Sequence, residues 1–207
     1  MDPDIDRGNS GFDIRHSVSA AITYDLSGPE SNSLLKAIFS HWSVDSILRA
    51  HTAPPVWITQ RPFLFPLFGV LGFSRPNLIQ GVPLYLYDRI YPGGKRINPA
   101  AFANAPLGQQ GTLGRNVLRG FPVSQLDFAV RRKFVLHEGV NLQFRAEFFN
   151  LFNHPNFAPP RDVFGFPVFG LSTSMLNQAL GADGAGLNQR YQIGGPRSIQ
   201  FALRIQF

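Results

Sequence analysis

The segment VNLQFRAEFF, from Val140 to Phe149, alternates apolar and polar side chains with a period of two. The apolar set comprises Val140, Leu142, Phe144, Ala146 and Phe148. The polar set comprises Asn141, Gln143, Arg145 and Glu147. Successive side chains of a strand point to opposite faces of its sheet. The segment is therefore predicted to be a strand between an apolar and a polar environment.

The preceding residues predict the partner of this strand. Residues 124–136 show the same alternation, and His137-Glu138-Gly139 separates the two segments. Three residues with a glycine suit a hairpin loop, with Gly139 in the left-handed conformation. Arg132 is the one charged residue in the apolar set, and in this hairpin it would lie opposite Phe144. We expect it close to the membrane surface, with its guanidinium reaching out of the lipid.

Three more segments alternate in the same way, and the whole chain is predicted to be all-β. Strands of soluble domains average about five or six residues, whereas tilted strands that cross a bilayer need about ten. The sequence predicts an antiparallel meander of about five long strands. They lie near residues 12–26, 36–50, 124–136, 140–149 and 198–207.

The connections between these strands are alternately short and long. Ser27–Ser33 and His137–Gly139 are short, whereas Ala50–Val123 and Asn150–Arg197 are long and rich in Gly, Pro and Asn. Outer-membrane barrels are connected in this way, by tight periplasmic turns and long outer loops. The alternative is a soluble β-sandwich binding module, in which the apolar faces pack against each other. Exposure of the apolar face distinguishes the two.

The stretch FFNLFNHPNF, from Phe148 to Phe157, follows directly on the fourth predicted strand. Asn150, Asn153 and the His154-Pro155 step should end the strand, because proline has no N–H to donate. Barrels carry aromatic residues where hydrocarbon meets the headgroups. We therefore expect an aromatic girdle, and the alternative is an aromatic cluster that closes a soluble sandwich. The expected girdle residues are Phe148, Phe149, Phe152 and Phe157.

Composition and motifs argue against an enzyme. The chain has no cysteine, which excludes disulfides, thiolate metal sites and cysteine nucleophiles. Its histidines lack metal-ligand spacing, and no GxSxG nucleophile elbow occurs. The net charge is +6, but the basic residues are spread over several strands among acidic ones, so nucleic acid is not an expected partner. We predict no catalytic, cofactor-binding or metal-binding residues and no cofactor.

Several motifs resemble the C-terminal end of TonB-dependent outer-membrane receptors. They are LQFRAEFFNLFNHPNF, GTLGRNVLRGF, RINPAAF, RPNLIQGVPLYL and the ending GGPRSIQFALRIQF. The nearest group is the Oar-like transporters, which carry an N-terminal carboxypeptidase-regulatory-like domain. In that family a plug domain precedes a barrel of about 22 strands. The resemblance implies that residues 1–207 form the C-terminal portion of such a barrel, as a fragment without the plug.

The resemblance also implies a function and a location. Such receptors import a scarce solute, too large for porins, across the outer membrane of a Gram-negative bacterium. The expected partners are outer-membrane lipid and the barrel-assembly machinery. The TonB complex would act only through the missing plug, and the substrate and any substrate-binding residues are unknown.

The last strand carries a further expectation. Phe201, Leu203, Ile205 and Phe207 occupy alternate positions and would all face lipid. An aromatic residue at the end of this face resembles the signal by which the insertion machinery recognises barrel proteins. The alternative is an ordinary strand that ends in Phe, since aromatic residues favour strands in general.

Overall fold

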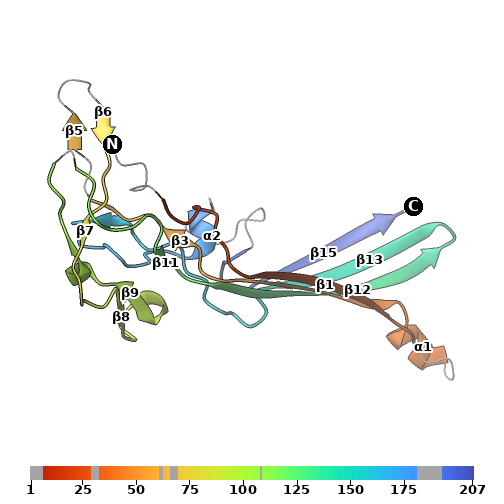
Figure 1. The fold of residues 1–207 in the computed structure, drawn as a ribbon. Coiled ribbons are helices and arrows are strands. Elements are labelled where there is room, and N and C mark those ends of the chain that lie inside the picture. The colour runs from red at the N-terminus through yellow and green to blue at the C-terminus, as the bar shows by residue number, and fades with distance from the viewer. Residues whose placement is uncertain (1–6, 29–32, 61–62, 66–69, 108, 181–192) are drawn as a thin grey trace.

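A five-stranded antiparallel sheet dominates the computed structural model (Figure 1). The structure describes residues 7–28, 33–60, 63–65, 70–107, 109–180 and 193–207. The strand order is β1-β2-β12-β13-β15, so each long strand lies beside the next one along the chain. The bounds are β1 Ser17–Leu26, β2 Trp42–His51, β12 Val123–His137, β13 Val140–Phe149 and β15 Ser198–Gln206. The predicted all-β meander of five long strands is confirmed.

The strand register sorts the side chains onto two faces as predicted. One row of paired residues on the apolar face comprises Tyr24, Val44, Val130, Ala146 and Phe201. The adjacent row on the polar face comprises Thr23, Asp45, Ala129, Glu147 and Gln200. The apolar face is open to the surroundings, with Ile22 68% and Leu203 71% exposed. The sandwich alternative is therefore wrong for this sheet, because a sandwich would bury these side chains.

The hairpin between β12 and β13 follows the prediction closely. Gly139 has a φ of +80°, in the left-handed region, and Arg132 pairs with Phe144. The strands extend further than expected, so that only Glu138 and Gly139 remain in the turn. A register shift between Val135 and His137 accommodates this tight connection.

The second strand begins later than predicted. Its expected start at residue 36 falls in helix α1, Ser33–Phe39, and β2 begins only at Trp42. Leu, Lys and Ala favour the helix, and His41 turns the chain after it with a φ of +64°. The Trp42 indole N–H donates to the Ile38 carbonyl at 2.9 Å, which satisfies a carbonyl near the helix end. Residues 29–32 of the predicted short turn lie outside the described residues.

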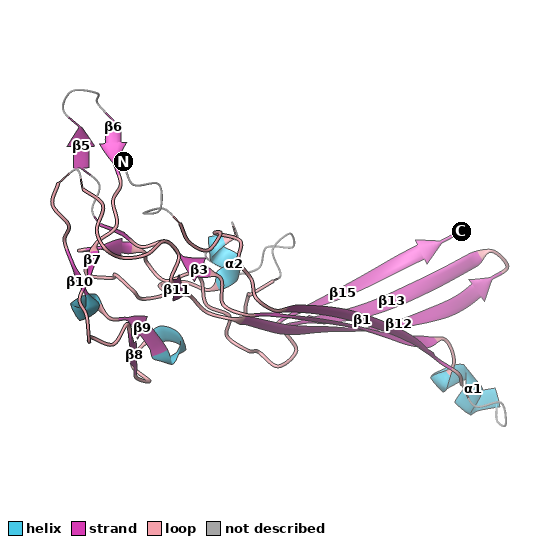
Figure 2. Ribbon diagram, in the orientation of Figure 1, coloured by secondary structure: helices cyan, strands magenta, loops and turns pink. Residues whose placement is uncertain are grey.

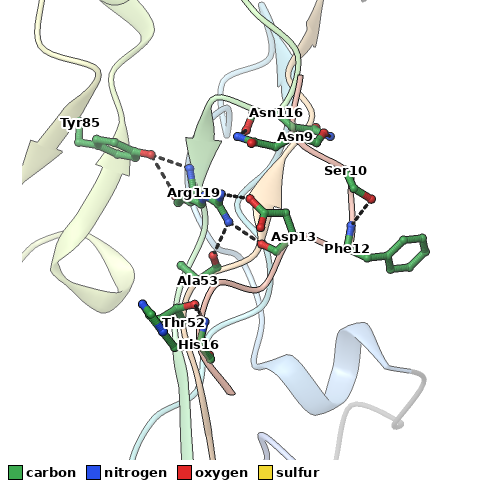
Figure 3. Close-up of polar contacts among 10 residues, drawn as sticks. All are labelled: Asn9, Ser10, Phe12, Asp13, His16, Thr52, Ala53, Tyr85, Asn116 and Arg119. Carbon is green, nitrogen blue, oxygen red and sulfur yellow. Dashed lines mark hydrogen bonds and ion pairs between the residues drawn. The ribbon is translucent and has the colours of Figure 1, made fainter. Parts of the chain in front are cut away.

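The first strand is also shorter than the predicted range 12–26, since β1 begins at Ser17. Asp13 instead forms an ion pair with Arg119 and accepts a second bond from it through its main-chain carbonyl (Figure 3). The Arg119 guanidinium also donates to the Ala53 carbonyl, and its backbone N–H donates to the Tyr85 hydroxyl at 2.7 Å. These contacts draw the segment before β1 toward the long connections.

The two long connections fold together into one layer at one end of the sheet (Figure 1), which we call the loop layer. It comprises residues 52–122 and 150–197, as far as these are described. Its hydrophobic core contains Val56, Ile58, Ile97, Ala101, Phe102, Leu113, Leu118 and Phe169. The rings of Phe102, Phe164 and Phe169 lie 5.4–5.9 Å apart as centroids, so both connections contribute to this core.

Short strands hold the loop layer together (Figure 2). Antiparallel pairs are β3 with β11, β5 with β6, β7 with β10 and β8 with β9, whereas β4 and β14 pair in parallel across the two connections. The bounds in the first connection are β3 Pro55–Val56, β4 Thr59–Gln60, β5 Phe63–Phe65, β6 Val70–Gly72, β7 Asn77–Leu78, β8 Tyr85–Tyr87, η2 Pro92–Gly94, β9 Lys95–Ile97, η3 Pro99–Ala101, β10 Phe102–Ala103 and β11 Leu118–Arg119. The second connection contains β14 Val163–Phe164 and α2 Leu176–Ala179.

Candidate functional site

Charged side chains form a network across the polar face of the sheet. The Arg145 guanidinium lies 2.9 Å from the Glu147 carboxylate and 3.5 Å from Asp45. Arg131 approaches the same Asp45 at 3.5 Å and Asp25 at 3.7 Å. These residues come from four different strands, and only the sheet register brings them together. The face is therefore a charged wall whose opposite charges largely compensate each other.

A second set of polar contacts lies where this wall meets the loop layer. The buried Asp127 carboxylate accepts from the Arg49 guanidinium, the Gln125 side chain and the Asn150 backbone N–H, at 2.7–2.9 Å. Gln125 in turn accepts from the Gly194 backbone N–H at 2.7 Å. A buried carboxylate needs such donors, because removal from water is otherwise unfavourable. Asp127 thus fixes the geometry of this junction.

A cavity of about 290 Å³ lies on the polar face of the sheet, lined by residues of β2, β12 and β13 and by Ile193 of the loop layer. Asp45, Asp127 and Glu147 contribute carboxylates to its lining, and Arg49 and Arg145 contribute guanidinium groups. Phe149, Ile47 and Ile193 add apolar surface. Such a mixture can form hydrogen bonds with a polar solute while packing against its less polar parts.

The asparagines of FFNLFNHPNF hold the loop layer onto the end of the sheet. Asn150 has a φ of +50° and is 1% exposed. Its side-chain amide donates to the carbonyls of His154 and Gly195, and its side-chain oxygen accepts from the His154 backbone N–H, each at 2.8–2.9 Å. Asn156 binds both backbone groups of Ser124, at 2.9 and 3.1 Å. This structural role was not predicted from the sequence, although asparagine tolerates a left-handed backbone and could have indicated it.

A protein family described as outer membrane beta barrel domain matches residues 1–200 of the chain. The chain belongs to this family. Neither a curated protein nor a solved structure matches it. Family membership agrees with the long amphipathic strands and implies an outer-membrane location. In such a barrel the apolar face of the sheet contacts lipid, and the polar face lines the interior.

The residues predicted for the girdle of this outer-membrane barrel segment do not come together. Phe148 lies on the apolar face beside Phe128, with ring centroids 6.4 Å apart, and Phe152 is 75% exposed. Phe149 lies on the polar face opposite Ser198, because a strand turns successive side chains to opposite faces. Phe157 packs on Phe121 in the loop layer, 5.3 Å between centroids. Contact of these four residues with the membrane interface stays a prediction.

The four residues of the predicted assembly signal lie at the free edge of the sheet. Phe201, Leu203 and Ile205 project from the apolar face of β15 and are exposed, and Phe207 follows the strand. Their positions agree with contact to lipid. Their role in assembly stays a prediction.

The described ranges contain no group of three or more His, Asp or Glu side chains that could hold a metal ion. No helix in those ranges has the length and apolar character to span a membrane. In the loop layer, the Lys95 ammonium lies 5.0 Å from the Tyr85 ring centroid and 4.9 Å from that of Phe121. Burial lowers the pKa of Lys95 from its ordinary value.

Proposed function

We propose that this chain forms part of the wall and outer loops of a TonB-dependent transporter in the outer membrane of a Gram-negative bacterium. The transporter would import a scarce solute and would not act as an enzyme. The observation that supports this proposal is the cavity on the polar face of the sheet, which the loop layer meets at Ile193. In a barrel, that position lies inside the wall, beneath the outer loops.

The lining of the cavity supports a polar solute. Its ionic groups are paired with one another, as Arg145 is with Asp45 and Glu147. Because these opposite charges largely compensate each other, the lining offers polar groups for hydrogen bonds without strongly favouring a solute of one charge. A solute rich in hydroxyl or amide groups fits this lining better than an apolar one.

The proposal includes partners from the receptor resemblance. The apolar face would contact outer-membrane lipid, and the barrel-assembly machinery would insert the protein. The TonB complex would supply energy through a plug domain. No step involves nucleic acid or a cofactor.

Uptake measurements in the native host test the proposal. We expect deletion of the gene to abolish uptake of one class within a panel of labelled ferric chelates, cobalamin and oligosaccharides. A restored parent copy should return uptake, and a protonophore should stop it, because energised import needs the inner-membrane proton gradient. Uptake that resists the protonophore would indicate a passive channel. Uptake of the whole panel unchanged by deletion would contradict transport of these solutes.

Variants of the charged wall test whether the cavity takes part in uptake. Arg145→Gln removes the charge shared by Asp45 and Glu147, and we expect it to reduce uptake at unchanged outer-membrane levels. Arg204→Gln is the matched control, because Arg204 lies on the same face in β15 but does not line the cavity. Equal effects of the two variants would contradict a role of the cavity.

A further inference from the structure

A second cavity lies on the opposite, apolar face of the sheet. It has a volume of about 520 Å³ and lies between helix α1 and strands β1, β2 and β12. Among the described residues its lining is apolar apart from Ser27, and it comprises Leu26, Ile38, Phe39, Trp42, Val44 and Val130. Few polar groups are available there for a sugar or a peptide backbone, so the lining suits a hydrocarbon chain.

A positive charge lies at the rim of this cavity. Arg132 pairs with Trp42 in the register, and its guanidinium lies 5.1 Å from the Trp42 ring centroid and 4.5 Å from that of Phe134. Two aromatic rings hold a guanidinium by cation–π attraction and restrict its motion. The described neighbours of Arg132 on this face include the apolar residues Val130 and Phe144, so a cation is held beside apolar side chains.

The position of Arg132 along the sheet places it near the periplasmic surface of the membrane. Figure 1 shows α1 and the turn between β12 and β13 at the end of the sheet opposite the loop layer. Short turns of outer-membrane barrels lie on the periplasmic side. Trp42 at this level matches the preference of tryptophan for the membrane interface. The α1 helix adds a second basic residue, Lys36, in its last turn.

We propose that this groove binds an anionic glycerophospholipid of the periplasmic leaflet. One acyl chain would lie in the apolar cavity against Ile38 and Val44, and the headgroup phosphate would pair with Arg132. The charge and the groove are both required, because an acyl chain alone would not favour one headgroup over another. The site lies on the face away from the cavity of the proposed transport function and does not depend on it.

Quenching of tryptophan fluorescence tests the proposal directly. The chain has two tryptophans, Trp42 and Trp57, so Trp57→Phe leaves a single reporter in the groove. This variant of the full chain is refolded in dodecyl maltoside and titrated with phosphatidylglycerol or phosphatidylcholine carrying brominated acyl chains. We expect half-quenching by phosphatidylglycerol at about fivefold lower concentration, the factor expected for one basic residue near an anionic lipid surface.

Variants separate the headgroup from the acyl chain. Arg132→Gln should remove the fivefold preference, Arg132→Lys should keep part of it, and Arg204→Gln on the polar face should leave it unchanged. Ile38→Asp should weaken quenching by both lipids, since it places a charge in the groove. Circular dichroism confirms that each variant retains its strands.

Two results would overturn the proposal. One is equal half-quenching by the two lipids in the protein with native Arg132, which would mean non-specific contact with the micelle. The other is a preference that survives Arg132→Gln, which would assign the anion to another group. If Arg132→Gln does not fold, the comparison uses Arg132→Lys and Arg204→Gln. Loss of the preference for phosphatidylglycerol to the same extent in both variants would also contradict the site.

Discussion

Asparagine residues at the end of β13 decide how the loop layer joins the sheet. Asn150 combines a left-handed backbone with side-chain bonds to His154 and Gly195. Its backbone N–H also donates to the buried carboxylate of Asp127. A single residue therefore orients the second long connection and one wall of the charged cavity.

Replacing this side chain should destabilise the junction. We expect Asn150→Ala to lower the free energy of unfolding by about 1–3 kcal/mol, because buried backbone groups lose their partners. The control is Asn141→Ala near the opposite end of β13, for which a change within about 0.5 kcal/mol is expected. Urea titration of the chain refolded in detergent, followed by circular dichroism, measures both. Equal losses would contradict the role assigned to Asn150.

Lys95 gives the loop layer a dependence on pH. Burial lowers its pKa from 10.5, so below that value the unfolded chain binds more protons on this side chain than the folded chain does. Its contribution to stability therefore rises as pH increases through the lowered pKa toward 10.5. Burial raises the pKa of Tyr85 above 10.0, which lowers stability at still higher pH.

The variant Lys95→Met isolates this contribution. We expect the stability of the parent relative to the variant to increase with pH from neutral to about pH 10. Urea titrations of the chain refolded in detergent, followed by circular dichroism, measure it. A difference that is independent of pH would contradict the effect of burial on Lys95.

At the scale of elements, the β12–β13 hairpin depends on the backbone of Gly139. An added Cβ would meet nothing within 4 Å, so space does not require a glycine there, whereas the φ of +80° does. Gly139→Val should destabilise the hairpin by about 1–2 kcal/mol, the cost of a left-handed conformation for an ordinary residue. Gly139→Asn should cost less, since asparagine tolerates this region. Thermal unfolding in detergent compares them, and equal losses would point to a cause other than φ.

The long strands could be predicted from sequence, because the alternation of apolar and polar residues within each strand reflects the two environments on its two faces. A period of two identified β12, β13 and β15 to within a few residues, and the same alternation placed Asp45, Arg145 and Glu147 on one face. The error at residue 36 has a local cause, because α1 is a single short helix whose apolar residues coincide with the alternation of β2. The error at residue 12 has a distant one, because Asp13 is held by Arg119 from another part of the chain.

Neither the loop layer nor the cavity could be predicted from sequence patterns, because both form through contacts between residues far apart in the chain. The buried Phe102 and Phe169 lie far apart in the chain and carry no periodic signal. Asn150 and Gly194 meet the strand residues Asp127 and Gln125 through tertiary contacts that no local pattern indicates. Pattern analysis assigns residues to faces, but it does not assign partners between distant loops.

For the whole molecule, exposed apolar surface predicts poor behaviour in water. Within the described part of the chain, β1 and β15 are the edges of the sheet, and each pairs with one long strand. Unpaired edges beside an exposed apolar face favour association between chains. We expect the 207-residue chain to sediment as aggregates in plain buffer and to disperse in detergent. A monodisperse monomer without detergent, measured by analytical ultracentrifugation, would contradict a lipid-facing role for this face.

The shared core of the loop layer has a consequence for how the protein can diverge. Phe102 lies in the first long connection, and its ring contacts Phe164 and Phe169 in the second. A larger or smaller side chain at one of these positions requires a compensating change across the contact. The two outer loops are therefore expected to co-evolve, with volume changes at Phe102 matched at Phe164 or Phe169 among relatives. New ligand specificity would then arise through paired substitutions, and exchange of one loop alone between relatives would leave mismatched halves of a common core.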